Sequence, residues 1–284
     1  MIYAIIPTFN RKGHLLRCLE CLSKQDTEVI AIISDSGSTD GSAKEVAEKF
    51  PDAVYLNGHP DLWWTGATNL GLSYFQEHAA PNDFFLLLND DTEFSSHYCG
   101  ALLTLAMSIQ NSIIGSACVD IENDDILIDG GITVNWLTAH NKILNYGTKL
   151  SDFSAGHAET VSVLPGRGTL YPASVLDKVG LLDDTNLPHY GADYEYSRRC
   201  TFNDYLLLVS YDAVILSDTT TTGIHRHGSK WTLEAVRQFF WERRSACNLP
   251  DRYQYSFRTA THVVKGCIFF LCSVIRLTKR FLTT

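Results

Sequence analysis

The chain has 284 residues, 45% of them hydrophobic and 19% charged, and its formal net charge is -9 at pH 7. This apolar share is ample for a buried core, so the composition excludes a disordered chain and leaves one large α/β domain or two ordinary ones. The acidic balance argues against a nucleic-acid-binding protein, because binding to a phosphate backbone needs a basic surface.

The first hundred residues alternate between two hydrophobic patterns. Continuous apolar runs predict buried strands at residues 1–8, 29–34, 53–57 and 83–89. Helical patterns lie between them and cover residues 12–24, 41–50 and 65–79. Such an alternation is typical of a parallel sheet covered on both faces, and these sheets bind ligands beyond the carboxyl ends of their strands. We therefore expect the functional residues directly after each strand.

The segment after the second strand, SDSGSTDGS at 34–42, combines a glycine turn, several hydroxyl groups and a following helix. These features suit a nucleotide bound near a helix N-terminus. Asp35 could accept hydrogen bonds from a base or a ribose. The alternative for this segment is helix capping, which Ser38 or Asp40 could also provide.

The fourth strand ends in Asn89, Asp90 and Asp91. Adjacent carboxylates repel each other and destabilise the fold unless a cation or hydrogen-bond donors compensate them. They indicate a site for a divalent metal that bridges a diphosphate, because Mg and Mn prefer hard oxygen ligands. The alternative is an N-cap, in which Asp91 or Thr92 caps a helix that begins near Ser95 or Ser96. The residue types alone leave both interpretations open.

From about residue 113 the strand patterns become shorter. They cover 113–121 and 126–134, and a polar connection runs through about 158. An apolar segment at 161–171, a helix at 172–180, a loop over 183–195 and a strand at 205–216 follow. We find no internal repeat and no low-complexity linker, so we predict one continuous domain over 1–230 and a helical C-terminal extension over 231–284.

Four motifs occur in a fixed order: PTFNR at 7–11, SDSGSTDGS at 34–42, GATNLG at 66–71 and NDDTEF at 89–94. Their order and spacing resemble those of the family 2 inverting glycosyltransferases of the GT-A fold. Within that family the chain is similar to the rhamnosyltransferase-like bacterial enzymes of polysaccharide assembly. The segments at 165–184 and 189–199 are similar to the family's acceptor-side segment, so the resemblance covers about residues 1–230.

The resemblance implies an α/β fold with a GT-A type, Rossmann-like, mostly parallel central sheet flanked by helices. Its nucleotide-sugar half covers about 1–112 and its acceptor half about 113–230. It also implies a nucleoside-diphosphate sugar as donor and a divalent metal, Mn or Mg, as cofactor. The residues expected at the nucleotide sugar are Pro7, Thr8, Asn10, Asp35, Ser36, Gly66, Asn69, Asn89, Asp90 and Arg167.

For the reaction itself, the resemblance implies that Asp91 binds the metal and that Asp193 is the catalytic base. Glu195 and Arg198 follow at matching spacing and are expected to orient the site. A base that takes the acceptor proton and a metal that neutralises the leaving diphosphate together permit a single inverting displacement. The alternative for Asp193 and Glu195 is a solvated helix start, with Arg198 as their helical partner.

Two departures from the family pattern affect these predictions. Ala192 stands where the family usually has a glutamate, which leaves the choice of base open between Asp193 and Glu195. Trp63 and Trp64 take positions that are often small. They could form a stacking wall for the base or sugar, or they could simply belong to the core.

A cationic cluster, HRHGSK, occupies residues 225–230. His225 could be a further metal ligand, as in relatives where one arrives from a late loop, and we favour it over His227. The cluster could instead clamp the diphosphate electrostatically. The alternative is a solvated loop without a partner.

The C-terminal extension has two helical patterns, an amphipathic one at 231–249 and an apolar one with Lys and Arg at 261–284. Basic residues beside an apolar face suit an anionic membrane surface, where polyprenol-linked acceptors are found. Packing on the core or in a homo-oligomer is an equal alternative. The scattered cysteines and the start of the sequence at a strand favour a cytoplasmic protein, peripheral at the inner face of the membrane.

We therefore predict a metal-dependent inverting hexosyl- or rhamnosyltransferase. It would move a sugar to a hydroxyl of a glycan or lipid-linked acceptor in bacterial polysaccharide assembly. One alternative is a sugar nucleotidyltransferase, which normally has a glycine-rich loop where this chain has PTFNR. The other is a non-catalytic nucleotide-sugar binding protein, which would have no use for a base at Asp193.

Overall fold

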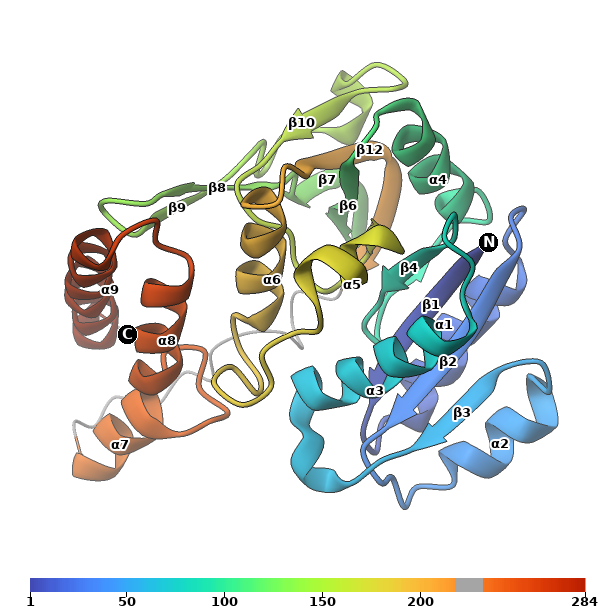
Figure 1. Ribbon diagram of the computed structural model, residues 1–284, viewed down its shortest axis with the longest axis horizontal. Coiled ribbons are helices and arrows are strands. Elements are labelled where there is room, and N and C mark those ends of the chain that lie inside the picture. The colour runs from blue at the N-terminus through green and yellow to red at the C-terminus, as the bar shows by residue number, and fades with distance from the viewer. Residues whose placement is uncertain (218–231, 284) are drawn as a thin grey trace.

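The structure is a computed structural model that describes residues 1–217 and 232–283. The predicted cationic cluster at 225–230, with His225 and His227, lies outside these residues. Within them, ten strands form one sheet with the order β10-β12-β6-β11-β4-β1-β2-β3, with β5 beside β12 and β7 beside β6 (Figure 1).

The N-terminal half of the sheet is parallel, as predicted. It consists of β1 (Ile2–Thr8), β2 (Val29–Asp35), β3 (Val54–Asn57) and β4 (Phe84–Leu87). The connecting helices are α1 (Lys12–Ser23), α2 (Ser42–Lys49) and α3 (Trp63–His78), and the short 3-10 helix η1 (Pro60–Leu62) precedes α3. Because parallel strands need crossover connections, their carboxyl ends come together at one edge of the sheet.

The C-terminal half of the sheet mixes directions. β6 and β12 are parallel to each other, while β11 is antiparallel to both β4 and β6. The strands and helices of this half are β5 (Glu93–Phe94), α4 (Tyr98–Ser108), β6 (Ser112–Asp120), β7 (Asn123–Asp129), β10 (Ala158–Thr160), β11 (Thr169–Pro172), α5 (Ser174–Val179), α6 (Ala192–Thr201) and β12 (Leu206–Ser217). A 3-10 helix, η2 (Leu150–Asp152), and a hairpin of β8 (Ile132–Asn135) and β9 (His140–Ile143) lie outside the sheet. The predicted fold class, a mostly parallel central sheet flanked by helices, is confirmed.

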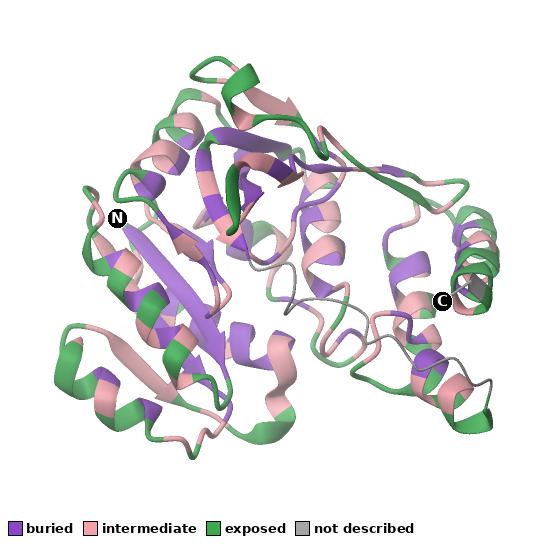
Figure 2. Ribbon diagram, turned by 180° about the vertical axis from the view of Figure 1, so that it is seen from behind, coloured by how far each residue is buried: buried purple, intermediate pink, exposed green. Residues whose placement is uncertain are grey.

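The core has a layer on each face of the sheet. Along β1, Tyr3 and Ile5 belong to one apolar cluster, while Ile2, Ala4 and Ile6 belong to the other. Successive side chains of a strand point to opposite faces, so a strand covered on both sides is apolar throughout. Figure 2 shows these central strands as buried and the outer sides of the helices as exposed.

Three C-terminal helices, α7 (Leu233–Trp241), α8 (Leu249–Arg258) and α9 (Val263–Thr283), lie apart from β1–β4 (Figure 1). The prediction of one helix over 231–249 is wrong in its extent, because α7 ends at Trp241. The next helix starts where Asn248 Oδ1 accepts a hydrogen bond from the backbone of Asp251, with Pro250 in the first turn. None of the described helices combines the length and apolarity that crossing a membrane requires.

Two other predicted boundaries are corrected. The apolar run at 126–134 is two strands, because Gly130 and Gly131 interrupt it. A Cβ at Gly130 would lie 2.4 Å from the Tyr211 hydroxyl, and Gly131 has a φ of +115°. The predicted loop over 183–195 ends early, since α6 begins at Ala192 directly after Gly191, whose φ is 82°.

Candidate active site

The turn after β4 holds the two adjacent carboxylates. Asp90 is buried, and its Oδ2 accepts a hydrogen bond of 2.8 Å from the Thr8 hydroxyl. The guanidinium of Arg11 bridges the pair, with Nη1 3.3 Å from Asp90 Oδ1 and Nη2 2.7 Å from Asp91 Oδ2. A cation from the protein therefore compensates the repulsion between the carboxylates.

The capping alternative for this turn is wrong. Asp91 pairs with Arg11, and the Thr92 hydroxyl donates to the carbonyl of Asn89 at 2.8 Å. The next helix begins only at Tyr98, and no side chain of the described residues caps its N-terminus. The two aspartates thus pair with a guanidinium and do not cap a helix.

The residues present fit a divalent metal. Burial raises the pKa of Asp90 to about 6, although Arg11 and the hydrogen bond from Thr8 act in the opposite direction. The carboxylates of Asp90 and Asp91 supply hard oxygens at a site that already attracts a guanidinium. Among the described residues no group of three or more His, Cys, Asp or Glu side chains gathers as a metal cage. Mg is commonly held by one or two carboxylates together with substrate phosphates and waters, and this arrangement suits that mode.

The loops after β1 and β2 are tied together. Pro7 and Thr8 lie beside Ser34 and Asp35 in the strand register. The backbone and hydroxyl of Ser38 both donate to Asp35, at 2.9 and 2.5 Å.

Further bonds close the same edge of the sheet. Asn10 donates through its backbone to the Ser38 hydroxyl at 2.7 Å and accepts from the backbone of Thr39 at 2.8 Å. The backbone of Ser36 donates to the carbonyl of Thr8. Asp40 accepts from the backbones of Lys12 and Ser42, so it orders the start of α1 as well as that of α2.

Trp64 connects this edge to the acceptor-side segment. Its indole Nε1 donates to Asn89 Oδ1 at 3.2 Å. The far end of the same ring lies against Gly166, where a Cβ would be 2.3 Å from the indole and 3.4 Å from Asp193 Cβ. The ring therefore lies between the β4 turn and Asp193, although these residues are far apart in the sequence.

Trp63 lies in a different environment. Its backbone has a φ of 54° and a ψ of -166°, a region that non-glycine residues rarely adopt. Its ring centroid is 5.6 Å from that of His189, and the guanidinium of Arg243 lies 5.3 Å over it. Whether either tryptophan stacks on a ligand stays a prediction.

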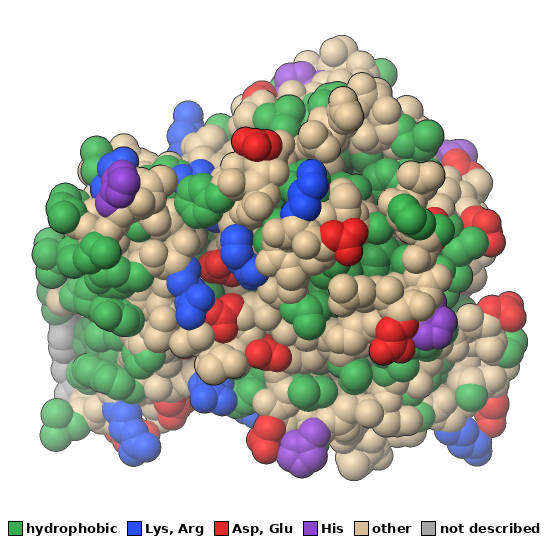
Figure 3. Space-filling model, in the orientation of Figure 1, with side chains coloured by type: hydrophobic (Ala, Val, Ile, Leu, Met, Phe, Trp, Pro, Cys, Tyr) green, Lys and Arg blue, Asp and Glu red, His purple; other side chains and the backbone are tan. Residues whose placement is uncertain are grey.

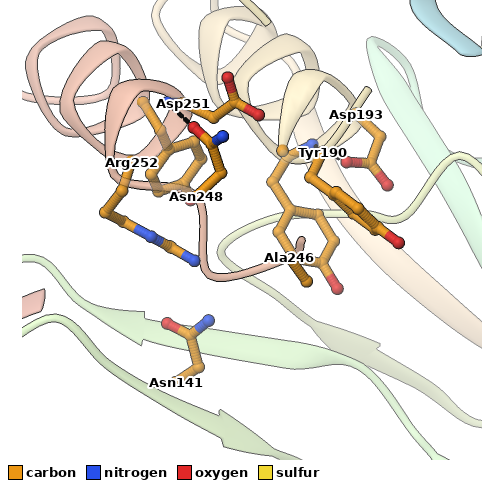
Figure 4. A pocket seen from close by; sticks show the side chains of 10 residues that line it. Asn141, Tyr190, Asp193, Ala246, Asn248, Asp251 and Arg252 are labelled. Carbon is orange, nitrogen blue, oxygen red and sulfur yellow. Dashed lines mark hydrogen bonds between the residues drawn. The ribbon is translucent and has the colours of Figure 1, made fainter. Parts of the chain in front are cut away.

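Asp193 lies in the first turn of α6. Its Oδ2 accepts a hydrogen bond from the backbone of Gly166 and its Oδ1 from that of Tyr194, both at 2.9 Å. Burial raises the pKa of its carboxyl above the usual value, against the effect of these bonds and of Arg167. The side chain of Asp193 lines a cavity of about 280 Å³ (Figure 4).

Glu195 and Arg198 have other partners. Arg199 holds both carboxylate oxygens of Glu195 at 3.0 Å, so the predicted pairing of the carboxylates with Arg198 is wrong. Arg198 instead lies between the rings of Trp136 and Phe202, 4.4 and 4.5 Å from their centroids. Asp193 is the carboxylate of this segment that lines the cavity.

Three other predicted residues contact neighbouring segments. Arg167 reaches Asp129 at 3.2 Å. The amide of Asn69 donates to the carbonyl of Leu182 and accepts from its backbone N–H, which ties α3 to that loop. A Cβ at Gly66 would lie 3.2 Å from the side chain of Leu62. Their roles at a nucleotide sugar stay predictions.

Arg11, Gly166 and the α8 residues of the cavity were not among the site residues predicted from the sequence. Arg11 is the last letter of the motif PTFNR, but its partners are about 80 positions away. The signal that the sequence offered was a cationic residue at the end of a motif expected at the nucleotide sugar.

Comparison with known proteins gives two findings. The family model described as Glycosyl transferase family 2 matches residues 3–167. No sequence relative was found among the curated proteins.

Solved structures share the fold. Residues 1–349 of S. aureus TarS align over 99% of this chain and 72% of that one, with a TM-score of 0.59 and 10% identity. GalNAc-T7 with UDP, GalNAc and Mn²⁺ aligns over 91% and 50%, with a TM-score of 0.62 and 15% identity. A mannosyltransferase from Pyrobaculum calidifontis with GDP-Man and Mn²⁺ aligns over 95% and 68%, with a TM-score of 0.57 and 14% identity.

Proposed function

Since the chain belongs to glycosyl transferase family 2, we propose that it transfers a hexosyl or rhamnosyl unit, with inversion, from a nucleoside-diphosphate sugar to an acceptor hydroxyl. The observation that carries this proposal is the position of Trp64. The ring contacts Asn89 beside the paired aspartates and Gly166 beside Asp193. A carboxylate pair for a diphosphate and a separate carboxylate for a hydroxyl thus share one site.

The donor lies at the carboxyl ends of β1, β2 and β4. Asp35 accepts from the base or ribose, and the loop that Asn10 and Ser38 close lies beside it. Solved neighbours of the same fold contain GDP-Man and UDP-GlcNAc, which supports a nucleotide sugar as the donor. Asn89 and Asp90 line the donor side of the β4 turn.

Asp91, with Asp90 beside it, would hold Mn²⁺ or Mg²⁺. When bound, the metal neutralises the charge that develops on the leaving diphosphate. The guanidinium of Arg11 bridges both carboxylates, so it must turn away, and the diphosphate offers it a bidentate partner. Neighbours that contain Mn²⁺ support a divalent metal.

Asp193 takes the proton of the acceptor hydroxyl. Its raised pKa makes it a better base than an exposed aspartate, and the backbones of Gly166 and Tyr194 orient its oxygens. A base on the face opposite the diphosphate yields one displacement and an inverted anomeric centre. Glu195 supports the site indirectly, because Arg199 already holds it.

The acceptor is a glycan or polyprenol-linked saccharide of bacterial polysaccharide assembly. The protein binds this acceptor at the inner face of the membrane. Residues 231–284 carry nine Lys or Arg and three Asp or Glu, in a chain of net charge -9. One face of α9 exposes the apolar side chains of Val264, Ile268, Leu271, Ile275 and Leu282. Hydrophobic side chains gather over α9 at the left of Figure 3. Basic charge beside an apolar stripe suits an anionic bilayer surface.

The donor assignment is tested by thermal shift with a panel of nucleoside diphosphates, with and without Mn²⁺. Metal-dependent stabilisation by one nucleotide is expected, because a ligand that binds the folded state raises its stability. A screen of nucleotide sugars that follows nucleotide release by mass spectrometry then identifies the sugar. A protein that responds to no nucleotide would overturn the donor site.

The assignment of the base is tested with Asp193→Asn. This variant should bind the nucleotide as the unaltered protein does and lose transfer. Asp177→Asn, which changes an exposed carboxylate on α5, is the matched control and should keep both properties. Retained transfer in Asp193→Asn would remove Asp193 from the role of base.

A further inference from the structure

A cavity of about 280 Å³ separates the start of α6 from α8 and the β8–β9 hairpin (Figure 4). Asp193 and Tyr190 come from the α6 side. Asp251 and Arg252 come from α8, and Asn141 comes from β9. Three segments that are distant in the sequence therefore meet around the carboxylate proposed as the base.

Asp251, in the wall of this cavity, has an acceptor that no hydrogen bond uses among the described residues. Its Oδ2 is buried and has no hydrogen-bond partner among the described residues, while its backbone N–H is used by the cap from Asn248. A buried polar atom without a partner is costly, so natural proteins rarely keep one without a use. Burial also raises the pKa of Asp251 to about 6, which keeps part of the population protonated and able to donate near neutral pH.

Arg252 has donors to spare. Its guanidinium lies 5.7 Å from the ring centroid of Tyr255, and no ion pair joins it to the described part of the chain. In Figure 4 it extends into the space between α8 and Asn141. A guanidinium carries five N–H donors, and a stacked one keeps them available for a ligand.

The lining excludes several kinds of ligand. Two carboxylates, Asp193 and Asp251, repel an anionic group, while Arg252 disfavours a cation. A purely apolar ligand would leave Asp251 Oδ2 and the guanidinium of Arg252 without polar partners in the cavity. A hydroxyl both donates and accepts, so a neutral ligand with many hydroxyls satisfies carboxylate, guanidinium and amide together. The rings of Tyr190 and Tyr255 offer flat apolar faces in the same walls.

We propose that this cavity is an acceptor subsite that binds one neutral sugar ring, whose hydroxyls are read by Asp251, Arg252 and Asn141 while another is presented to Asp193. The volume lies at the small end of ligand sites, which matches one ring and not an oligosaccharide. This inference rests on the proposed function. It goes further because α8 lies beyond residues 3–167, so the chain's own extension selects the acceptor.

The experiment uses the full chain and saturation-transfer NMR with the methyl pyranosides of glucose, galactose, N-acetylglucosamine and rhamnose. At least one glycoside should bind the unaltered protein. Arg252→Met and Asn141→Ala come from different elements, and each should weaken that binding about tenfold, the effect of losing one good hydrogen bond to a charged or polar group. Arg237→Met, on an exposed position of α7 that does not line the cavity, should bind the glycoside unchanged.

The outcomes separate this inference from the proposed function. Nucleotide-induced thermal shifts are measured on the same samples and should be equal in all variants. If no glycoside binds, or if both cavity variants bind as the control does, the subsite is refuted even when nucleotide binding is intact. If nucleotide binding is absent while the glycoside binds at these residues, the donor site fails and the sugar subsite stands.

Discussion

The bridge that Arg11 makes between Asp90 and Asp91 predicts the behaviour of Arg11→Gln. The guanidinium is 41% exposed, while Asp90 is 4% and Asp91 18% exposed. Exposed ion pairs contribute about 0–1 kcal/mol, and breaking a buried pair costs about 3–5 kcal/mol. This half-buried bridge lies between those limits, so the free energy of unfolding should fall by about 2 kcal/mol at pH 8. For a chain of this length the melting temperature should fall by roughly 5 °C.

The stability lost in Arg11→Gln should depend on pH. The pKa of Asp90 in the folded protein is about 6, above the usual value of 3.8 for an unfolded aspartate. Ionising Asp90 therefore destabilises the fold as pH rises from about 4 through 6. Arg11 lowers this pKa, so its removal raises the pKa of Asp90 further and enlarges the cost at high pH. The difference in stability between the unaltered protein and Arg11→Gln should therefore be largest at pH 8 and shrink towards pH 5.

Mn²⁺ provides a second readout without any turnover. A metal bound at Asp90 and Asp91, as proposed, would have to displace the guanidinium of Arg11 in the unaltered protein but not in Arg11→Gln. Mn²⁺ alone should therefore raise the melting temperature of the variant more than that of the unaltered protein, since stabilisation follows the affinity of the folded state.

The matched control for Arg11→Gln is Arg17→Gln. Arg17 is 53% exposed and pairs with Glu93 at 3.0 Å, so its loss should cost about 0–1 kcal/mol with no added response to Mn²⁺. Urea denaturation at pH 5 and 8, with and without the metal, measures all these quantities. Equal losses in the two variants, or a loss in Arg11→Gln that is the same at both pH values, would refute the reasoning.

Three further perturbations test other parts of the structure. Gly166→Ala would place a Cβ 2.3 Å from the Trp64 ring, so the free energy of unfolding measured in urea should fall by about 1–3 kcal/mol. The displaced ring should also change the tryptophan fluorescence and slow transfer. An unchanged emission spectrum would contradict this packing. Burial lowers the pKa of His189 in the folded protein to about 4. The unfolded chain therefore protonates this histidine at a higher pH than the folded one does, and the free energy of unfolding falls as pH drops from about 6.5 to 4. His189→Phe should abolish this pH-dependent loss, which is on the order of 1–3 kcal/mol after allowance for partial exposure. If the free energies of unfolding of both proteins depend on pH in the same way, this expectation is wrong. Ile275→Asp should weaken sedimentation of the protein with phosphatidylglycerol vesicles. Met107→Asp, at a similarly exposed position on α4, should not. If the unaltered protein does not bind such vesicles, α9 is no membrane surface.

The N-terminal half shows how far hydrophobic patterns reach. The predicted and observed bounds of the first two strands differ by one residue, because a strand buried on both faces is a nearly continuous apolar run that ends within one or two polar residues. The first helix likewise matches its predicted range to within one residue at its end. Local composition carries these elements, so they are readable without any tertiary information.

The elements around the cavity were less predictable. The start of α6 was predicted as a loop, and α8 was not predicted, because the helical pattern at 231–249 reaches only its first residue. Both helices are ten residues long and consist mostly of polar and aromatic residues, so their sequences lack a clear apolar helical pattern. Their position depends on packing, as in the contact of α6 with α8. Helices of about ten residues are marginal alone and are stabilised by such tertiary contacts.

The amino-acid sequence was sufficient to place a carboxylate pair at the end of a buried strand and to order the motifs of a family 2 glycosyltransferase. It could not reveal that Arg11 neutralises that pair, that Trp64 joins Asn89 to Gly166, or that α8 forms a wall beside Asp193. Periodicity and turn chemistry are local and act between near neighbours in the chain. Charge compensation and cavity walls depend on which distant segments the folded core brings within a few ångströms, and only the tertiary structure contains that information.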